Sequence, residues 1–216
     1  MARQSVFLEA VSLELRDKNG LTEQEFLAAY RPGKYERPSL TADIAVFIVE
    51  QERLRLLLVK RGGHPYLGCW ALPGGFAKKD ESVDETAARE LEEETGLAGL
   101  PLAQVGLFSK PGRDPRMWVA SEAFVSVIPP ERIQETRAGD DAADARWFDV
   151  ERRQENNRIT LLFSSGDVSF QAELQRKAAL PGAYPSTAAY TVTAGGGLAF
   201  DHGEIIAAAM DKIGLL

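Results

Sequence analysis

The sequence has a single cysteine, Cys69, among its 216 residues. One thiol cannot form an internal disulfide, so the fold must be stabilised by a hydrophobic core. A single cysteine also fits a reducing compartment. Long apolar runs are missing too, because the longest clear one, residues 44–49, is far too short to span a bilayer. Charged residues also interrupt the N-terminal segment, which excludes a signal-peptide core. We therefore expect a cytoplasmic protein with no membrane partner.

Positive charge is in deficit, with 25 Lys and Arg against 32 Asp and Glu and a net charge of −7. This balance argues against a nucleic-acid-binding surface, so we expect no DNA or RNA partner. A nucleotide is not excluded, because a metal ion and a few arginines can bind phosphates locally. The only histidines, His64 and His202, lack the spacing of a histidine-rich metal site. We interpret them as residues of a turn and of a helix start.

The length and the 44% hydrophobic content suit one sizeable core with an appendage. We predict an N-terminal extension over residues 1–40 and one domain over residues 41–216. Within the extension, Thr22 and Glu25 form a capping box that begins a helix. The elements expected there are a short strand near residues 6–15, a turn at residues 18–20 and the helix over residues 22–30.

Strands outnumber helices in the predicted domain. Residues 41–49 and 54–60 are rich in β-branched and aliphatic side chains around a polar turn, which predicts a buried hairpin. Further strands are expected at residues 102–108, 117–127, 145–148, 159–163, 168–174 and 190–192. A final helix over residues 202–213 would be capped by Asp201. Its buried face would consist of Ile205, Ile206, Ala209 and Ile213.

The most informative stretch, GFAKKDESVDETAARELEEETGL, runs from Gly75 to Leu97 after a Pro-Gly-Gly loop. Ser82 and Glu85 form a capping box that begins a helix, and Gly96 supplies its stop. With about 100° of rotation per residue, three glutamates share one narrow arc of this helix: Glu90, Glu93 and Glu94. An apolar stripe adjoins that arc, so the carboxylates border the core. The stripe consists of Val83, Ala87 and Leu91.

Carboxylates one helical turn apart repel one another by roughly 0.2 to 0.5 kcal/mol per pair, and partial burial increases this repulsion. A bound cation would reverse the sign of the interaction. Hard oxygen ligands at this spacing suit Mg²⁺ or Mn²⁺, which keep several waters and bridge to phosphate oxygens. The alternative is a solvated acidic helix without a ligand. The full motif around these residues favours the metal site.

The motif reads Gly75, five residues, Glu81, seven residues and then REL-x-EE-x-GL, which is the Nudix box without a mismatch. The resemblance to the Nudix hydrolases covers roughly residues 40–150 and includes GCWALPGG at residues 68–75. It implies an α/β fold, an α/β/α sandwich around a mixed β-sheet. Further segments resemble the branch that includes ADP-ribose pyrophosphatases and Nudix-related regulators of NAD metabolism: KYERPSLTADIAVF, KRGGHPYLGCWALPGGF, GRDPR and LAFDHGEIIAAAM.

The resemblance also implies roles in catalysis. Substrates of the family are nucleoside diphosphates linked to another moiety, and cations can stabilise both ends of the displacement when water attacks phosphorus. The expected metal ligands are Glu90, Glu93 and Glu94, and the backbone carbonyl of Gly74 would complete the coordination. Arg89 would orient the acidic cluster, and Glu81 would assist a metal-bound water from the outer shell.

Residues outside the motif are candidates for substrate binding. Arg61, Arg113 and Arg116 lie after a strand or on a Gly/Pro-rich loop, where they can reach phosphate or ribose oxygens or form surface salt bridges. Phe76 could stack on a base. The general base stays open among carboxylates elsewhere in the chain. These are the acidic loop at residues 139–144, Glu131 and Glu135.

Two functions from different classes remain. The first is a metal-dependent pyrophosphohydrolase that cleaves ADP-ribose into AMP and ribose 5-phosphate, and the second is a sensor that binds ADP-ribose and controls transcription. Regulators of the family carry a winged helix after the Nudix domain, whereas this sequence ends at Leu216 soon after its FDH segment, so we expect the enzyme. Hydrolysis of damaged nucleoside triphosphates is a third, lesser alternative. The extension and residues 158–194 are expected to form a homodimer interface.

Overall fold

The computed structural model describes residues 15–31, 33, 35–51, 53–138, 142–177 and 189–216. The chain divides into two compact units, Met1–Arg37 and Pro38–Leu216. Among the described residues, no helix has the length and apolar character needed to cross a membrane.

The first unit contains helix α2 (Glu23–Ala29). It begins after Thr22, whose side chain and that of Glu25 form the predicted capping box. The predicted turn at residues 18–20 is also present. The strand expected near residues 6–15 falls outside the described residues, apart from its last position.

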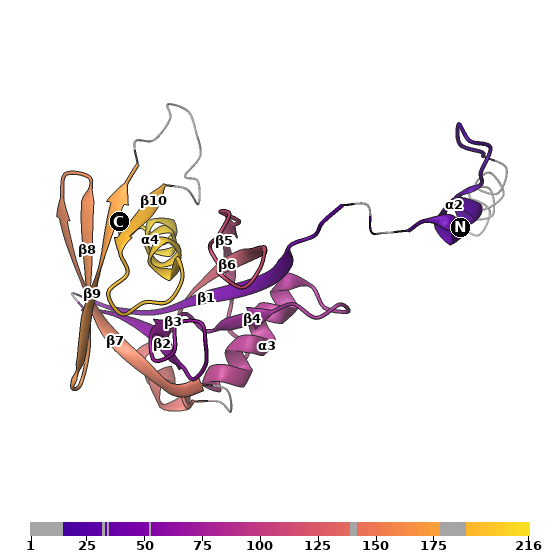
Figure 1. The fold of residues 1–216 in the computed structure, drawn as a ribbon. Helices are drawn as coiled ribbons and strands as arrows, with labels where there is room; N and C mark the ends of the chain where they lie inside the picture. Colours follow the sequence, from indigo (N-terminus) through magenta and orange to yellow (C-terminus); the bar gives the residue numbers. More distant parts are fainter. Residues whose placement is uncertain (1–14, 32, 34, 52, 139–141, 178–188) are drawn as a thin grey trace. The chain divides into compact units, whose positions relative to one another are not determined.

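A ten-stranded mixed sheet forms the centre of the second unit (Figure 1). Its strands are β1 (Ser39–Glu50), β2 (Arg53–Arg61), β3 (Trp70–Ala71), β4 (Gly74–Phe76), β5 (Ala103–Phe108), β6 (Val119–Val127), β7 (Ala142–Glu155), β8 (Arg158–Ser165), β9 (Val168–Arg176) and β10 (Tyr190–Ala194). They follow the order β10-β9-β8-β7-β2-β1-β6-β5, with β3 paired to β2 and β4 paired to β1. β1 and β6 run parallel, which makes the sheet mixed.

Two helices cover opposite faces of this sheet: α3 (Val83–Thr95) and α4 (His202–Lys212). Alternate residues of a strand point to opposite faces, and the central strand β1 is buried on both. Ala45 and Phe47 pack in one hydrophobic cluster with α4, whereas Ile44 and Val46 pack in another with α3. Figure 1 shows the two helices on either side of β1. The predicted α/β/α sandwich with a mixed sheet is therefore confirmed.

Helix α3 has the predicted boundaries because its signals are local. The side chains of Ser82 and Glu85 form both bonds of the capping box. Gly96 ends the helix at φ 76°, a left-handed conformation that suits glycine. Ala87 and Leu91 are buried against the sheet, as the apolar stripe predicts.

The structure differs from the sequence prediction at three strands and one helix end. β3 was not expected, and β4 forms where a loop was expected. Each pairs through its backbone, β3 with β2 and β4 with β1, and needs no apolar pattern. β7 is much longer than residues 145–148, since its second half forms an exposed, charged ribbon with β8. Asp201 precedes α4 as expected, but its side chain makes no capping bond. It binds Arg113 instead.

Candidate active site

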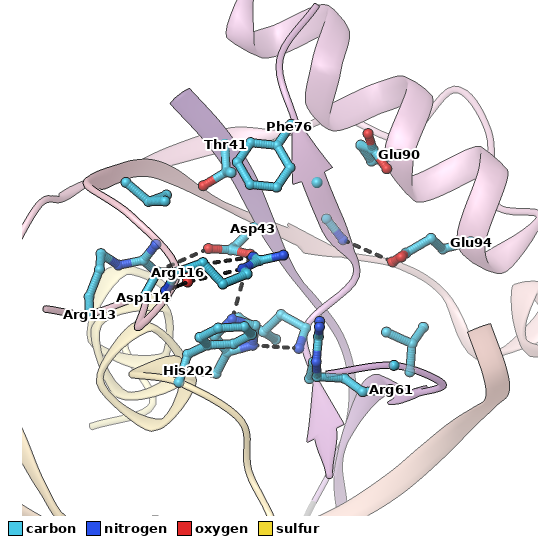
Figure 2. A pocket seen from close by; sticks show the side chains of 18 of the residues that line it. Thr41, Asp43, Arg61, Phe76, Glu90, Glu94, Arg113, Asp114, Arg116 and His202 are labelled. Atoms are coloured by element: carbon cyan, nitrogen blue, oxygen red, sulfur yellow. Dashed lines mark hydrogen bonds and ion pairs between the residues drawn. The ribbon is translucent and has the colours of Figure 1, made fainter. Parts of the chain in front are cut away.

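A cleft of about 410 Å³ opens beside the C-terminal half of α3 (Figure 2). Glu90 and Glu94 reach it from α3, and strand β1 contributes Asp43. The remaining walls come from the end of β2, the β3–β4 region, the loop before β6 and the start of α4. Segments far apart in the sequence therefore meet at one site.

Glu94 is the half-buried carboxylate at the centre of the acidic side. Its Oε2 accepts a hydrogen bond from the backbone N–H of Gly74 at 3.0 Å. Burial raises the pKa of Glu94 to about 7, and the negative charges of Glu90 and Asp43 add to this rise. The carboxylate of Glu90 packs on Gly75, where a Cβ would lie 2.5 Å from the carboxyl carbon. Only glycine fits there without displacing Glu90.

Arg89 connects the other acidic residues of the motif. Its Nη1 donates to Glu90 at 2.6 Å and to Glu93 at 2.9 Å. Its Nη2 and Nε donate to the two carboxylate oxygens of Glu81 at 2.7 and 3.0 Å. These bonds from Arg89 lower the pKa of Glu81 to about 2, with help from the N–H of Lys78. Arg89 thus joins three of the predicted acidic residues in one network.

Glu93 does not share the environment of its neighbours. Its side chain is 55% exposed and contacts Arg89 and Lys78, and it is absent from the described residues that line the cleft. In the described part of the chain, no three acidic, histidine or cysteine side chains form a preassembled metal site. The structure therefore brings Glu90 and Glu94 into the cleft and leaves Glu93 outside it. Metal binding by Glu93 stays a prediction.

The residues present fit a hard divalent cation. Glu90 and Glu94 supply carboxylate oxygens, the ligands that Mg²⁺ and Mn²⁺ prefer. Mutual repulsion between them favours a cation, because a positive charge would relieve the cost of ionising a half-buried Glu94. The hydroxyl of Thr41, also in the cleft wall, is buried without a hydrogen-bond partner among the described residues. Gly74 contributes an N–H bond to Glu94, and metal binding by its carbonyl stays a prediction.

Arg61 and Arg116 place positive charge in the same cleft. Arg61 donates its Nε to the carbonyl of Pro65 at 2.8 Å. Burial lowers the pKa of Arg61, and the charge of Arg116 lowers it further. Arg116 pairs with Asp114 at 2.7 Å and lies 5.3 Å over the ring of Phe76. Phe76 is therefore in the cleft, and base stacking by its ring stays a prediction.

Arg113 also lines the cleft, but it is the most buried of the three arginines expected to bind substrate. Its side chain is only 5% exposed. It donates to Asp201 at 2.7 and 2.9 Å and to Asp43 at 3.3 Å. Two carboxylates bind the guanidinium in a buried salt bridge. A contact between Arg113 and phosphate stays a prediction. Asp43 also accepts a hydrogen bond from Ser121 at 2.5 Å.

His202 completes this buried network. Its Nδ1 accepts the backbone N–H of Leu72 at 2.8 Å, and its Nε2 lies 3.6 Å from Asp43. Burial lowers the pKa of His202, so the ring is a neutral hydrogen-bond acceptor that ties α4 to the loop before β4. This agrees with its interpretation as a residue of a helix start.

Sequence reasoning missed Asp43, Asp114 and Phe200, all of which line the cleft. Asp43 had a usable signal, because it is a lone charge within the apolar strand LTADIAVF. Phe200 lies in the LAFDHGEIIAAAM segment that resembles the ADP-ribose branch, but its place in the cleft depends on contacts between distant segments. The candidate bases are not among the described lining residues of the cleft. Glu135 pairs with Arg132, while residues 139–141 lie outside the described part of the chain.

Fold and cleft together define an α/β protein in which helix carboxylates and arginines line one cavity. The NUDIX domain model matches residues 40–161, and the chain belongs to the NUDIX family. It is 42% identical over 117 residues to the ADP-ribose pyrophosphatase of Methanocaldococcus jannaschii, covering 54% of this chain and 64% of that protein. It is 38% identical over 112 residues to the ADPR responsive transcriptional repressor NtrR of Acinetobacter baylyi, covering 51% and 45% respectively. A MutT/nudix family protein from Enterococcus faecalis has a similar crystal structure, with a TM-score of 0.70 and 34% identity, covering 89% of this chain and 70% of that chain.

These comparisons confirm the resemblance to the Nudix hydrolases and to their ADP-ribose branch. The chain spans 64% of the length of the first curated relative and 45% of the second. One of these relatives is named as a transcriptional repressor. The expected absence of a nucleic-acid partner therefore stays a prediction, as does the cytoplasmic location.

Proposed function

We propose that this protein is a divalent-metal-dependent hydrolase that cleaves the diphosphate of ADP-ribose into AMP and ribose 5-phosphate. One observation carries the proposal: carboxylates that suit a cation and arginines that suit phosphates line the same cleft. Glu90 and Glu94 supply the first, and Arg61 and Arg116 supply the second. Similarity to the ADP-ribose pyrophosphatase of M. jannaschii supports ADP-ribose as the substrate.

The contacts of the cleft residues support a separate role for each of them in this reaction. A divalent cation held by Glu90 and Glu94 would neutralise phosphate charge and lower the pKa of a bound water. Arg61 and Arg116 would donate charge-assisted hydrogen bonds to the phosphate oxygens. Arg89 restrains the carboxylate of Glu90 through a 2.6 Å bond, which keeps that ligand oriented toward the cleft.

Product analysis tests this proposal directly. Purified protein with Mg²⁺ and ADP-ribose should release AMP and ribose 5-phosphate in equal amounts, which anion-exchange chromatography measures. EDTA should abolish the release, and added Mn²⁺ should restore it. A panel of other nucleoside diphosphate derivatives and nucleoside triphosphates determines the specificity. Absence of turnover on every member would overturn the proposal.

An ADP-ribose sensor is the second candidate, because one relative is an ADPR responsive transcriptional repressor. A sensor needs only to bind its ligand, whereas Glu90 and Glu94 give this cleft the groups that hydrolysis requires. Tight binding of ADP-ribose with no turnover in Mg²⁺ or Mn²⁺ would favour the sensor.

We also propose that the protein forms a homodimer through its N-terminal unit. Helix α2 buries none of its residues, and Phe26, Leu27 and Tyr30 are 44%, 61% and 51% exposed. The rings of Phe26 and Tyr30 lie 5.5 Å apart, and neighbouring exposed apolar side chains of this kind are typical of interaction sites. Light scattering after size-exclusion chromatography should give twice the chain mass of 23.6 kDa. Phe26→Ser with Tyr30→Ser should shift the protein to monomer, and a wild-type monomer would contradict the proposal.

A further inference from the structure

Phe200 lies outside the matched NUDIX region and yet lines the cleft. Its φ is +50°, a left-handed conformation that residues other than glycine rarely adopt. Such a conformation persists where surrounding contacts hold the backbone. Here the residues before and after Phe200 make contacts that hold its backbone. Ala199 donates its N–H to the carbonyl of Trp70 at 2.8 Å, and Asp201 binds Arg113 at 2.7 Å.

Two guanidinium groups lie against the ring of Phe200. The Cζ atoms of Arg61 and Arg116 lie 4.9 and 5.9 Å from the ring centroid. Both distances are within the range of cation–π attraction, which is stronger where the cation is desolvated. The rings of His202 and Tyr66 lie 5.4 and 4.7 Å from the same centroid. Packing therefore fixes the ring on which the arginines lie.

Arg61 and Arg116 repel each other in this arrangement. The charge of Arg116 adds to burial in lowering the pKa of Arg61. Asp114 partly compensates Arg116, whereas the guanidinium of Arg61 donates to the neutral carbonyl of Pro65. Adjacent guanidinium groups held against their repulsion suit an anion that carries two neighbouring charged groups.

We infer that Phe200 is a positioning residue that holds Arg61 and Arg116 together as a binding site for the two linked phosphates of a diphosphate. The inference deepens the proposed function, on which it rests for the nature of the substrate. The pairing of the arginines is nevertheless independent of hydrolysis. Because two linked phosphates can engage both guanidinium groups, the site favours a diphosphate over a monophosphate product.

Substitution of the ring tests this role. Phe200→Leu keeps an apolar side chain and removes the aromatic face, whereas Phe200→Tyr retains it. The probe is inorganic pyrophosphate, titrated by calorimetry into full-length protein in EDTA. Phe200→Leu should weaken pyrophosphate binding roughly tenfold, and Phe200→Tyr should bind it within about twofold of wild type. In the hydrolysis assay, Phe200→Leu should raise KM for ADP-ribose roughly tenfold and leave kcat within about twofold.

Phe170→Leu is the matched control. Its partly buried ring stacks on Phe163 at 4.9 Å against the core, and it is not among the lining residues of the cleft. The same change there should lower thermal stability and leave pyrophosphate binding unchanged.

Three results would overturn the inference: wild-type affinity in Phe200→Leu, equal weakening in Phe170→Leu, or no pyrophosphate binding by the wild type. Pyrophosphate binding that depends on Phe200 without ADP-ribose hydrolysis would instead refute the proposed function and leave the inference standing.

Discussion

Glu94→Gln should lower kcat for ADP-ribose hydrolysis by about three orders of magnitude and leave the fold intact. Metal stabilisation of a phosphoryl-transfer transition state is worth several kcal/mol, and each decade of rate corresponds to about 1.4 kcal/mol. Glutamine keeps the shape of the side chain and can still accept the N–H of Gly74, which lies 3.0 Å from Oε2. It removes the negative charge that would bind the cation. Steady-state kinetics with circular dichroism of the variant measures both parts of the expectation.

Glu92→Gln is the control for this change, because Glu92 is an exposed residue of the same helix. It should retain kcat within about twofold, since surface charges away from the cleft contribute little. If Glu94→Gln retains more than a tenth of wild-type activity at saturating Mg²⁺, the metal assignment is wrong.

The same variant should be more stable than wild type when metal is absent and pH is high. The pKa of Glu94 is about 7 in the folded protein, against an ordinary value of 4.5. The Glu94 carboxyl therefore keeps its proton to higher pH in the folded state than in the unfolded state. As a result, the free energy of unfolding falls as pH rises from about 4.5 to about 7. Above that window the loss is constant at about 3 kcal/mol or less. Glutamine removes this loss. The variant should therefore have a higher midpoint of thermal unfolding than the wild type in EDTA at pH 8. Added Mg²⁺ should raise the midpoint of the wild type more than that of the variant.

Local signals explain which parts of the fold were predictable. The ends of α3 are fixed by Ser82, Glu85 and Gly96, all within or next to the helix. The first hairpin follows from apolar runs on either side of a polar turn, and the structure pairs Phe47 with Leu56 as that pattern requires. The motif also predicted the positions of Glu90 and Glu94, because helical rotation alone brings them to one side.

The rest of the site depends on contacts between distant segments. Arg113 is 70 residues from Asp43 and 88 from Asp201, and only the complete sheet with α4 brings them together. Phe200 reaches the cleft because its segment docks on Trp70, a contact that no local pattern indicates. β4 escaped prediction for a related reason, since its pairing with β1 uses backbone groups that every sequence possesses.

Arg113→Met should lower the free energy of unfolding by about 3 to 5 kcal/mol. Removal of one partner from a buried ion pair leaves an uncompensated buried charge, with a penalty of that size. Here Asp43 and Asp201 would both lose their shared guanidinium, and both are buried. Methionine keeps much of the apolar volume of the arginine side chain, so packing loss is small. At about 2 to 4 °C per kcal/mol for a chain of this size, the midpoint of thermal unfolding should fall by about 10 °C.

Two further variants separate lost charge compensation from other causes. Arg53→Met removes a comparable ion pair with Asp149 at the surface, where the two side chains are 60% and 37% exposed. It should barely move the unfolding midpoint, because water already solvates both charges. Arg113→Met with Asp201→Asn should recover part of the stability, since the amide carries no charge that needs compensation. A double variant no more stable than Arg113→Met would show that the arginine acts through packing, and that the buried carboxylates do not need it as a counter-charge.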